Sequence, residues 1–108
     1  MAFTIAQSEH YSQKISVGLP DEKGRIARSE FKVTFVRCNN DRLDELRTMI
    51  GRDVLKAVVI GWSDLVDDHD EPVPFSDANL DALMQIPQAA DALIDGFWSS
   101  QRNVHLKN

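Results

Sequence analysis

The 108-residue chain contains a single cysteine, Cys38, so it has neither a disulfide framework nor a set of cysteine ligands for zinc. No apolar run approaches the ~20 residues that a membrane-spanning helix requires. The first ten residues lack the basic segment and apolar core of a signal peptide. We therefore expect a protein of a reducing cytoplasm, with no membrane partner, in which Cys38 fills space at the end of a strand.

Basic residues are also scarce, with 12 Lys and Arg against 17 Asp and Glu, for a net charge of −5. This balance disfavours nucleic acid as the main partner, because binding to phosphates needs a concentrated positive field.

The sequence has few residues of the kinds that carry chemistry. Its three histidines, His10, His69 and His105, are scattered. It has no phosphate-cradling glycine loop, no G-x-S-x-G elbow and no H-E-x-x-H pair. We expect a protein that is not an enzyme and that uses no cofactor and no metal.

Alternating apolar residues are the clearest pattern in the first third of the chain. Ile15, Val17 and Leu19 alternate with small or polar residues, and Phe31, Val33 and Phe35 do the same. Between the two runs, residues 20–24 have the proline and glycine of a turn. The pattern predicts a β-hairpin over residues 14–37 with one buried face, preceded by a loosely held arm over residues 1–12. A hairpin alone is only marginally stable in water, so its buried face must pack on helices or on another chain.

Residues 40–101 show helical spacing. The oxygens of residues 39–41 suit a helix N-cap, and the apolar spacing that follows runs through Gly51. Either one helix kinks at Gly51 or two helices abut there, and we favour two. Residues 58–60 are β-branched and are equally compatible with the start of a strand. Ser76 suits the cap of a third helix, and Pro87 suits the first turn of a last helix that runs to about Gln101.

We therefore predict an α+β fold in one domain, residues 1–108, in which the N-terminal hairpin packs against about four short helices. An acidic loop lies near residues 63–75, and residues 102–108 form a frayed tail. Gly96 lies inside the last helix, at a cost of roughly 1 kcal/mol relative to alanine.

The acidic run at residues 67–71, Asp-Asp-His-Asp-Glu, invites a metal hypothesis. A calcium loop needs a glycine at its sixth position and a glutamate at its twelfth, and no register supplies them here. A zinc site lacks further nearby ligands. A catalytic carboxylate pair needs a pocket that separates the two pKa values, which a continuous polar run does not favour. Because prolines 72 and 74 follow at once, we expect a solvated turn between extended segments.

The last helix has an unusually wide apolar surface, because two rows of apolar residues cover an arc of about 180° where one packed face needs only ~100°. The rows are Ala89, Leu93, Phe97 and Ala90, Ile94, Trp98. Either the domain folds around this helix and buries most of it, or an edge near Trp98 stays open for a partner. The candidate protein-binding residues are Trp62, Phe75, Leu93, Phe97 and Trp98, since aromatic residues dominate such contacts.

The sequence between residues 30 and 100 resembles the tail assembly chaperones of long-tailed bacteriophages, and residues 60–87 are its most distinctive part. The matching residues are Gly61-Trp62, Leu65-Val66-Asp67, Glu71-Pro72-Val73-Pro74-Phe75-Ser76, Leu80, Leu83, Pro87 and the closing Ala/Leu/Phe helix. One departure is Asp70, where many members of that family have a glycine. Asp tolerates left-handed backbone better than most residues, so we expect the turn to survive.

The resemblance implies a non-catalytic role in virion morphogenesis, in which the protein holds the tape-measure protein soluble and recruits tail-tube subunits to it. It also implies a location in the host bacterial cytoplasm and absence from the mature virion. In many members a longer form arises by frameshifting near the end of the reading frame, here near Lys107-Asn108. The sequence leaves homo-oligomerisation open.

The sequence leaves three alternative functions open. The first is a tail-completion or connector subunit that stays in the virion. The second is a small metal-dependent regulator that uses the acidic run at residues 67–71. The third is an adaptor that binds a host protein.

Overall fold

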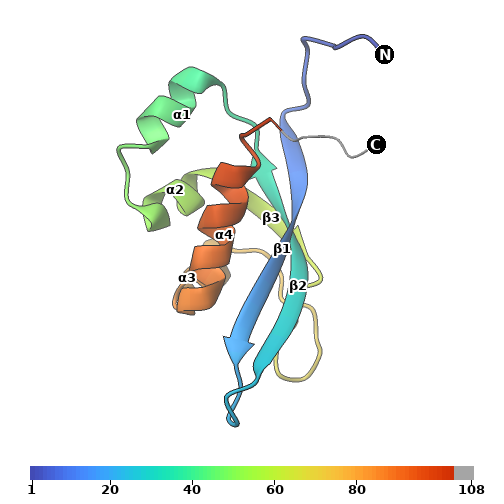
Figure 1. Ribbon diagram of the computed structural model, residues 1–108, viewed down its shortest axis with the longest axis vertical. Helices are drawn as coiled ribbons and strands as arrows, with labels where there is room; N and C mark the ends of the chain where they lie inside the picture. The colour runs from blue at the N-terminus through green and yellow to red at the C-terminus, as the bar shows by residue number, and fades with distance from the viewer. Residues whose placement is uncertain (104–108) are drawn as a thin grey trace.

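The computed structural model describes residues 1–103 and has the α+β architecture that the sequence predicts: a three-stranded antiparallel sheet with four helices on one of its faces (Figure 1). The sheet has the order β1-β2-β3. The elements are β1 (His10–Pro20), β2 (Ile26–Val36), α1 (Asn40–Leu46), α2 (Gly51–Val58), β3 (Val59–Ser63), α3 (Asp77–Met84) and α4 (Pro87–Ser99). Of the expected tail, residues 104–108 lie outside the described part.

The predicted hairpin is confirmed, with Ile15 opposite Phe31 on the buried face. The first strand starts earlier than expected, because β1 begins at His10 and the backbone N–H of Arg37 donates to the Glu9 carbonyl at 2.8 Å. The arm therefore covers residues 1–9 and not 1–12. The sequence did not predict a strand at residues 10–13, because most of the side chains there are polar and show no apolar alternation.

The helix boundaries follow the local capping signals. The side chain of Asn39 accepts from the backbone N–H of Arg42, and the Ser76 hydroxyl accepts from that of Asn79. The expected division into two helices is confirmed, but the helices do not abut: α1 ends at Leu46, residues 47–50 form a turn, and Gly51 begins α2. A Cβ atom at Gly51 would stand 2.5 Å from Cδ1 of Ile94, so the corner between α1 and α2 packs closely against α4.

Within the segment expected to be mainly helical, residues 59–63 form β3, so the strand that the β-branched residues 58–60 left open is the one observed. This strand pairs with β2, so that Trp62 lies opposite Val33 and β2 becomes the central strand. A five-residue strand that contains a glycine has little local signal, and its pairing with β2 decides its conformation.

The core lies between the inner face of the sheet and the helices. Phe35 of β2 contacts Phe97 of α4 edge-on, with ring centroids 5.2 Å apart, and the centroid of the Tyr11 ring lies 5.9 Å from that of Phe35. The outer face of the hairpin is exposed and polar except at Ile26 near the turn, and Lys14 and Glu30 form an ion pair there at 3.2 Å. Within residues 1–103, none of the helices combines the length and the apolar character needed to cross a membrane.

Candidate functional site

The two apolar rows of α4 have different environments. Leu93 and Phe97 are completely buried, so neither side chain is available to a partner and their assignment as contact residues is wrong. The reason is geometric: this row faces the inner side of the sheet, where Phe97 packs on Phe35. Burial of most of the helix was the alternative that the sequence left open.

The second row, with Ile94 and Trp98, is half-buried. The guanidinium carbon of Arg47 lies 5.4 Å from the centre of a Trp98 ring, a cation–π geometry that covers part of the indole. Trp98 also contacts Phe97 edge-on, with centroids 5.0 Å apart. The edge near Trp98 is therefore only partly open.

Trp62 and Phe75 hold the loop after β3 in place. Their rings meet edge-on with centroids 4.9 Å apart, and Nε1 of Trp62 donates to the Val73 carbonyl at 2.7 Å. Both side chains are half-buried. Their contacts with each other and with the loop give both residues a structural role, which explains their presence without a partner protein.

The acidic run forms the solvated turn that the sequence predicts. Oδ1 of Asp67 accepts from the backbone N–H groups of His69 and Glu71, at 2.8 and 3.0 Å. Asp70 is exposed and has a left-handed backbone with φ of +57°. Across residues 1–103, no group of three or more His, Cys, Asp or Glu side chains is placed to hold a metal ion.

Cys38 is half-buried just beyond the end of β2, as expected. Burial raises the pKa of its thiol above the ordinary value, and the nearby charge of Arg42 opposes the rise only in part. Its sulfur lies 3.7 Å from the Val36 carbonyl, to which it can donate. Because the thiolate is the reactive form, Cys38 is a weak nucleophile at neutral pH.

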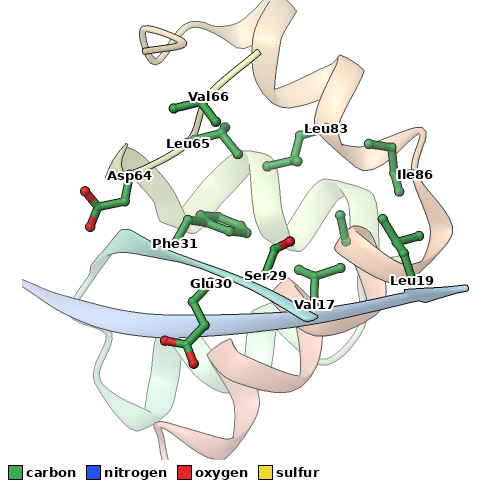
Figure 2. A pocket seen from close by; sticks show the side chains of 11 residues that line it. Val17, Leu19, Ser29, Glu30, Phe31, Asp64, Leu65, Val66, Leu83 and Ile86 are labelled. Atoms are coloured by element: carbon green, nitrogen blue, oxygen red, sulfur yellow. The ribbon is translucent and has the colours of Figure 1, made fainter. Parts of the chain in front are cut away.

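An apolar cleft of about 270 Å³ lies between the half of the hairpin nearest its turn and the α3–α4 corner. Figure 2 shows Val17, Leu19 and Phe31 on the hairpin side, facing Leu65, Val66 and Leu83 across the hollow. Ile86, between α3 and α4, closes one end and is 41% exposed. We call this feature the hairpin cleft; its lining is Val17, Leu19, Ser29, Glu30, Phe31, Asp64, Leu65, Val66, Leu83, Ile86 and Ala89.

The polar groups of the hairpin cleft lie at its margin. The carboxylates of Glu30 and Asp64 point away from the hollow, at the end opposite Ile86 and Leu19 (Figure 2). Glu30 is paired with Lys14 on the outer face of the sheet. An apolar interior with charge only at its rim suits an apolar side chain from another segment and does not suit acid–base chemistry.

A second hollow of about 320 Å³ adjoins the hairpin cleft and shares Leu65, Val66, Leu83 and Ile86 with it. These four residues therefore form an apolar ridge between two depressions, and 49% of Val66 is exposed. Sequence reasoning missed the site because its residues come from several segments, so no single periodicity gathers them. The available signal was weak: Val66 and Ile86 are apolar but lie in connecting segments.

Comparisons of the chain with models of protein families, with curated proteins and with solved structures found no match.

Proposed function

We propose that this protein is a non-catalytic tail assembly chaperone of a long-tailed bacteriophage, which acts in the cytoplasm of the bacterial host. It holds the tape-measure protein soluble and recruits tail-tube subunits to it during virion morphogenesis. The proposal rests on the resemblance of residues 60–87 to that family. One structural observation supports it: an apolar ridge, not α4, presents the exposed apolar surface that a holding mechanism requires.

The ridge suits a client with several apolar side chains in succession. Two hollows lie on its two sides, so neighbouring apolar side chains of one helical or extended segment can enter both. The remainder of the protein is acidic, with a net charge of −5, which keeps a complex with an aggregation-prone client in solution. The proposed contact surface at Val66 and Ile86 replaces the set expected from sequence. Of that set, two side chains are fully buried and three are half-buried in contacts within the domain; the set is Leu93, Phe97, Trp62, Phe75 and Trp98.

Co-expression with the tape-measure protein of the same phage tests the proposal. The informative variant is Val66→Ser with Ile86→Ser, which makes the ridge polar. Both side chains are exposed enough for the fold to tolerate the change, and serine at position 86 suits the N-cap of α4. Each lost apolar contact is worth about 1–2 kcal/mol, so we expect at least a tenfold loss of client binding.

The matched control is Ile60→Ser, because Ile60 is 46% exposed and lies outside the hairpin cleft and the adjoining hollow. Soluble, co-purified tape-measure protein should fall with the ridge variant and stay unchanged with the control. Equal capture by the ridge variant, with circular dichroism showing an intact fold, would overturn the proposed surface. Detection of the protein in purified virions by mass spectrometry would overturn the chaperone assignment in favour of a structural subunit.

A further inference from the structure

The N-terminal arm, residues 1–9, presents apolar side chains that the body of the protein does not cover. Phe3 is 86% exposed and Ile5 is 92% exposed. Within residues 1–103 these are the most exposed large apolar side chains after Met1. Exposed phenylalanine and isoleucine on one short segment indicate a docking element, since an aromatic side chain buries about 150–250 Å² when it is covered.

The root of the arm is fixed to the sheet. Nε of Arg37 donates to the Ser8 carbonyl at 2.9 Å, and the Arg37 backbone N–H donates to the Glu9 carbonyl at 2.8 Å. The Arg37 guanidinium also stacks over the Tyr11 ring at 4.9 Å. As Figure 1 shows, the arm leaves the body at the end of the sheet opposite the turn of the hairpin.

The arm cannot bring Phe3 into the hairpin cleft of its own chain. From Ser8 to Phe3 the backbone spans at most about 18 Å when fully extended. The end of the cleft nearest to the arm is formed by Phe31, which pairs with Ile15, and the extended backbone from Ser8 to Ile15 covers about 24 Å. The apolar arm and the apolar cleft of one molecule are therefore separated by more than the reach of the arm.

We propose that the arm of one copy binds in the hairpin cleft of a second copy, and that the second copy returns its own arm, giving a twofold-symmetric dimer. Phe3 and Ile5 would cover the ridge at Val66 and Ile86. Residues 1–8 contain no charged side chain, so this segment approaches an acidic partner without repulsion between like-charged side chains. Twofold symmetry follows because the same two surfaces meet twice.

The dimer should be weak. Two reciprocal arms bury on the order of 1,000 Å² in total, which is the lower end of the range for specific interfaces. A weak contact suits a surface that must later be released to another ligand. The arm would thus shield the ridge until a client displaces it; this competition, though not the dimer itself, rests on the proposed function.

Sedimentation equilibrium of the full chain without any client tests the dimer. We expect a monomer–dimer equilibrium whose dissociation constant rises at least tenfold in an arm variant, Phe3→Ser with Ile5→Ser, and in the Val66→Ser, Ile86→Ser ridge variant. Ile60→Ser should leave it unchanged. Mixing the arm variant with the ridge variant should restore half of the contacts, because one intact arm then meets one intact cleft. A protein that stays monomeric, or a dimer that the arm variant does not weaken, would overturn the proposal.

Cross-linking places the contact. In a Cys38→Ser background, a mixture of Phe3→Cys and Ile86→Cys chains should form a disulfide-linked heterodimer under mild oxidation, whereas Phe3→Cys mixed with Ile60→Cys should not. A disulfide closed within one chain that carries both Phe3→Cys and Ile86→Cys would show that the arm folds back, which contradicts the proposal. Because none of these measurements contains a client, a failed dimer and a failed chaperone are distinguished.

Discussion

Gly96 of α4 lies directly against Ile15 of β1: a Cβ atom added at Gly96 would stand 2.5 Å from Cδ1 of Ile15. This contact explains a residue that weakens its own helix, since glycine in a helix interior costs about 1 kcal/mol relative to alanine. The missing side chain lets α4 approach the sheet closely enough for Phe97 to reach Phe35. Close packing of α4 on β1 is thus obtained at the expense of helix propensity.

The first prediction concerns this contact. Gly96→Ala should destabilise the protein by about 1 kcal/mol, because the overlap with buried Ile15 outweighs the gain in helix propensity. Ile15→Val alone should cost about 0.5–1.5 kcal/mol, because it removes one buried methyl group. In the double variant, the new alanine occupies the space of the lost methyl, so the two costs should not add.

Urea unfolding of the four proteins measures the coupling free energy. We expect the double variant to be more stable than the sum of the single changes implies, by at least about 1 kcal/mol. Simple additivity would mean that the Ile15 side chain turns away without cost, and that the glycine has no packing role.

Sequence predicted the parts of the fold that depend on local signals. The alternation around Ile15 and Phe31 indicated the hairpin, and Asn39 and Ser76 marked two helix starts that the structure confirms. Each signal involves residues within a few positions of one another, so one sequence is enough to recognise it.

The parts that were missed depend on distant segments. The β-branched residues 58–60 were compatible with a strand or a helix, and the pairing edge that β2 offers decides for β3. Likewise, helical spacing identified two apolar rows on α4 but did not show that the row with Leu93 and Phe97 faces the sheet. The ridge residues come from the loop after β3, from α3 and from the connection between α3 and α4, so no helical or strand period relates them.

The second prediction concerns the thiol of Cys38. Burial raises its pKa, so the folded chain keeps the proton to a higher pH than the unfolded chain does. Reaction with a disulfide reagent at pH 7 should therefore be several-fold slower for the folded protein than for the protein in denaturant. The rate should still be rising at about pH 10, roughly one unit above the ordinary pKa of 9.0, where the rate of the unfolded chain approaches its plateau.

The same shift has a consequence for stability. Because the folded chain binds the thiol proton more tightly than the unfolded chain does, Cys38 contributes to the folding stability. This stability is fully present below the ordinary pKa of 9.0 and is lost as the pH rises through the pKa of the folded state.

Cys38→Ser is the control for the reaction with the disulfide reagent. It should abolish that reaction, because the sequence has no other cysteine. A folded-state rate that saturates below pH 9 would contradict the raised pKa.

The last prediction concerns two turns with the same construction. In the first turn, Oδ1 of Asp21 accepts from the backbone N–H groups of Lys23 and Arg25. In the second, Oδ1 of Asp67 accepts from the backbone N–H groups at the same two spacings, those of residues 69 and 71. The fourth residue of each turn is left-handed: Gly24 has φ of +80° in the first, and Asp70 has φ of +57° in the second. One turn therefore has the residue that this backbone prefers, and the other does not.

Asp70→Gly should accordingly stabilise the protein by about 0.5–1 kcal/mol, because glycine takes the left-handed conformation without steric cost. Gly24→Ala should destabilise it by about 1–2 kcal/mol, purely through the backbone, since no atom lies within 4 Å of the added Cβ.

Asp68→Gly is the matched control for Asp70→Gly. It removes the same charge from the same exposed turn, but at a residue that is not left-handed. We expect it to be neutral or destabilising, because there glycine only adds freedom to the unfolded chain. Thermal unfolding at two salt concentrations separates the backbone effect from the charge effect. If both substitutions stabilise equally, and only at low salt, repulsion among the carboxylates is the cause and the backbone explanation fails.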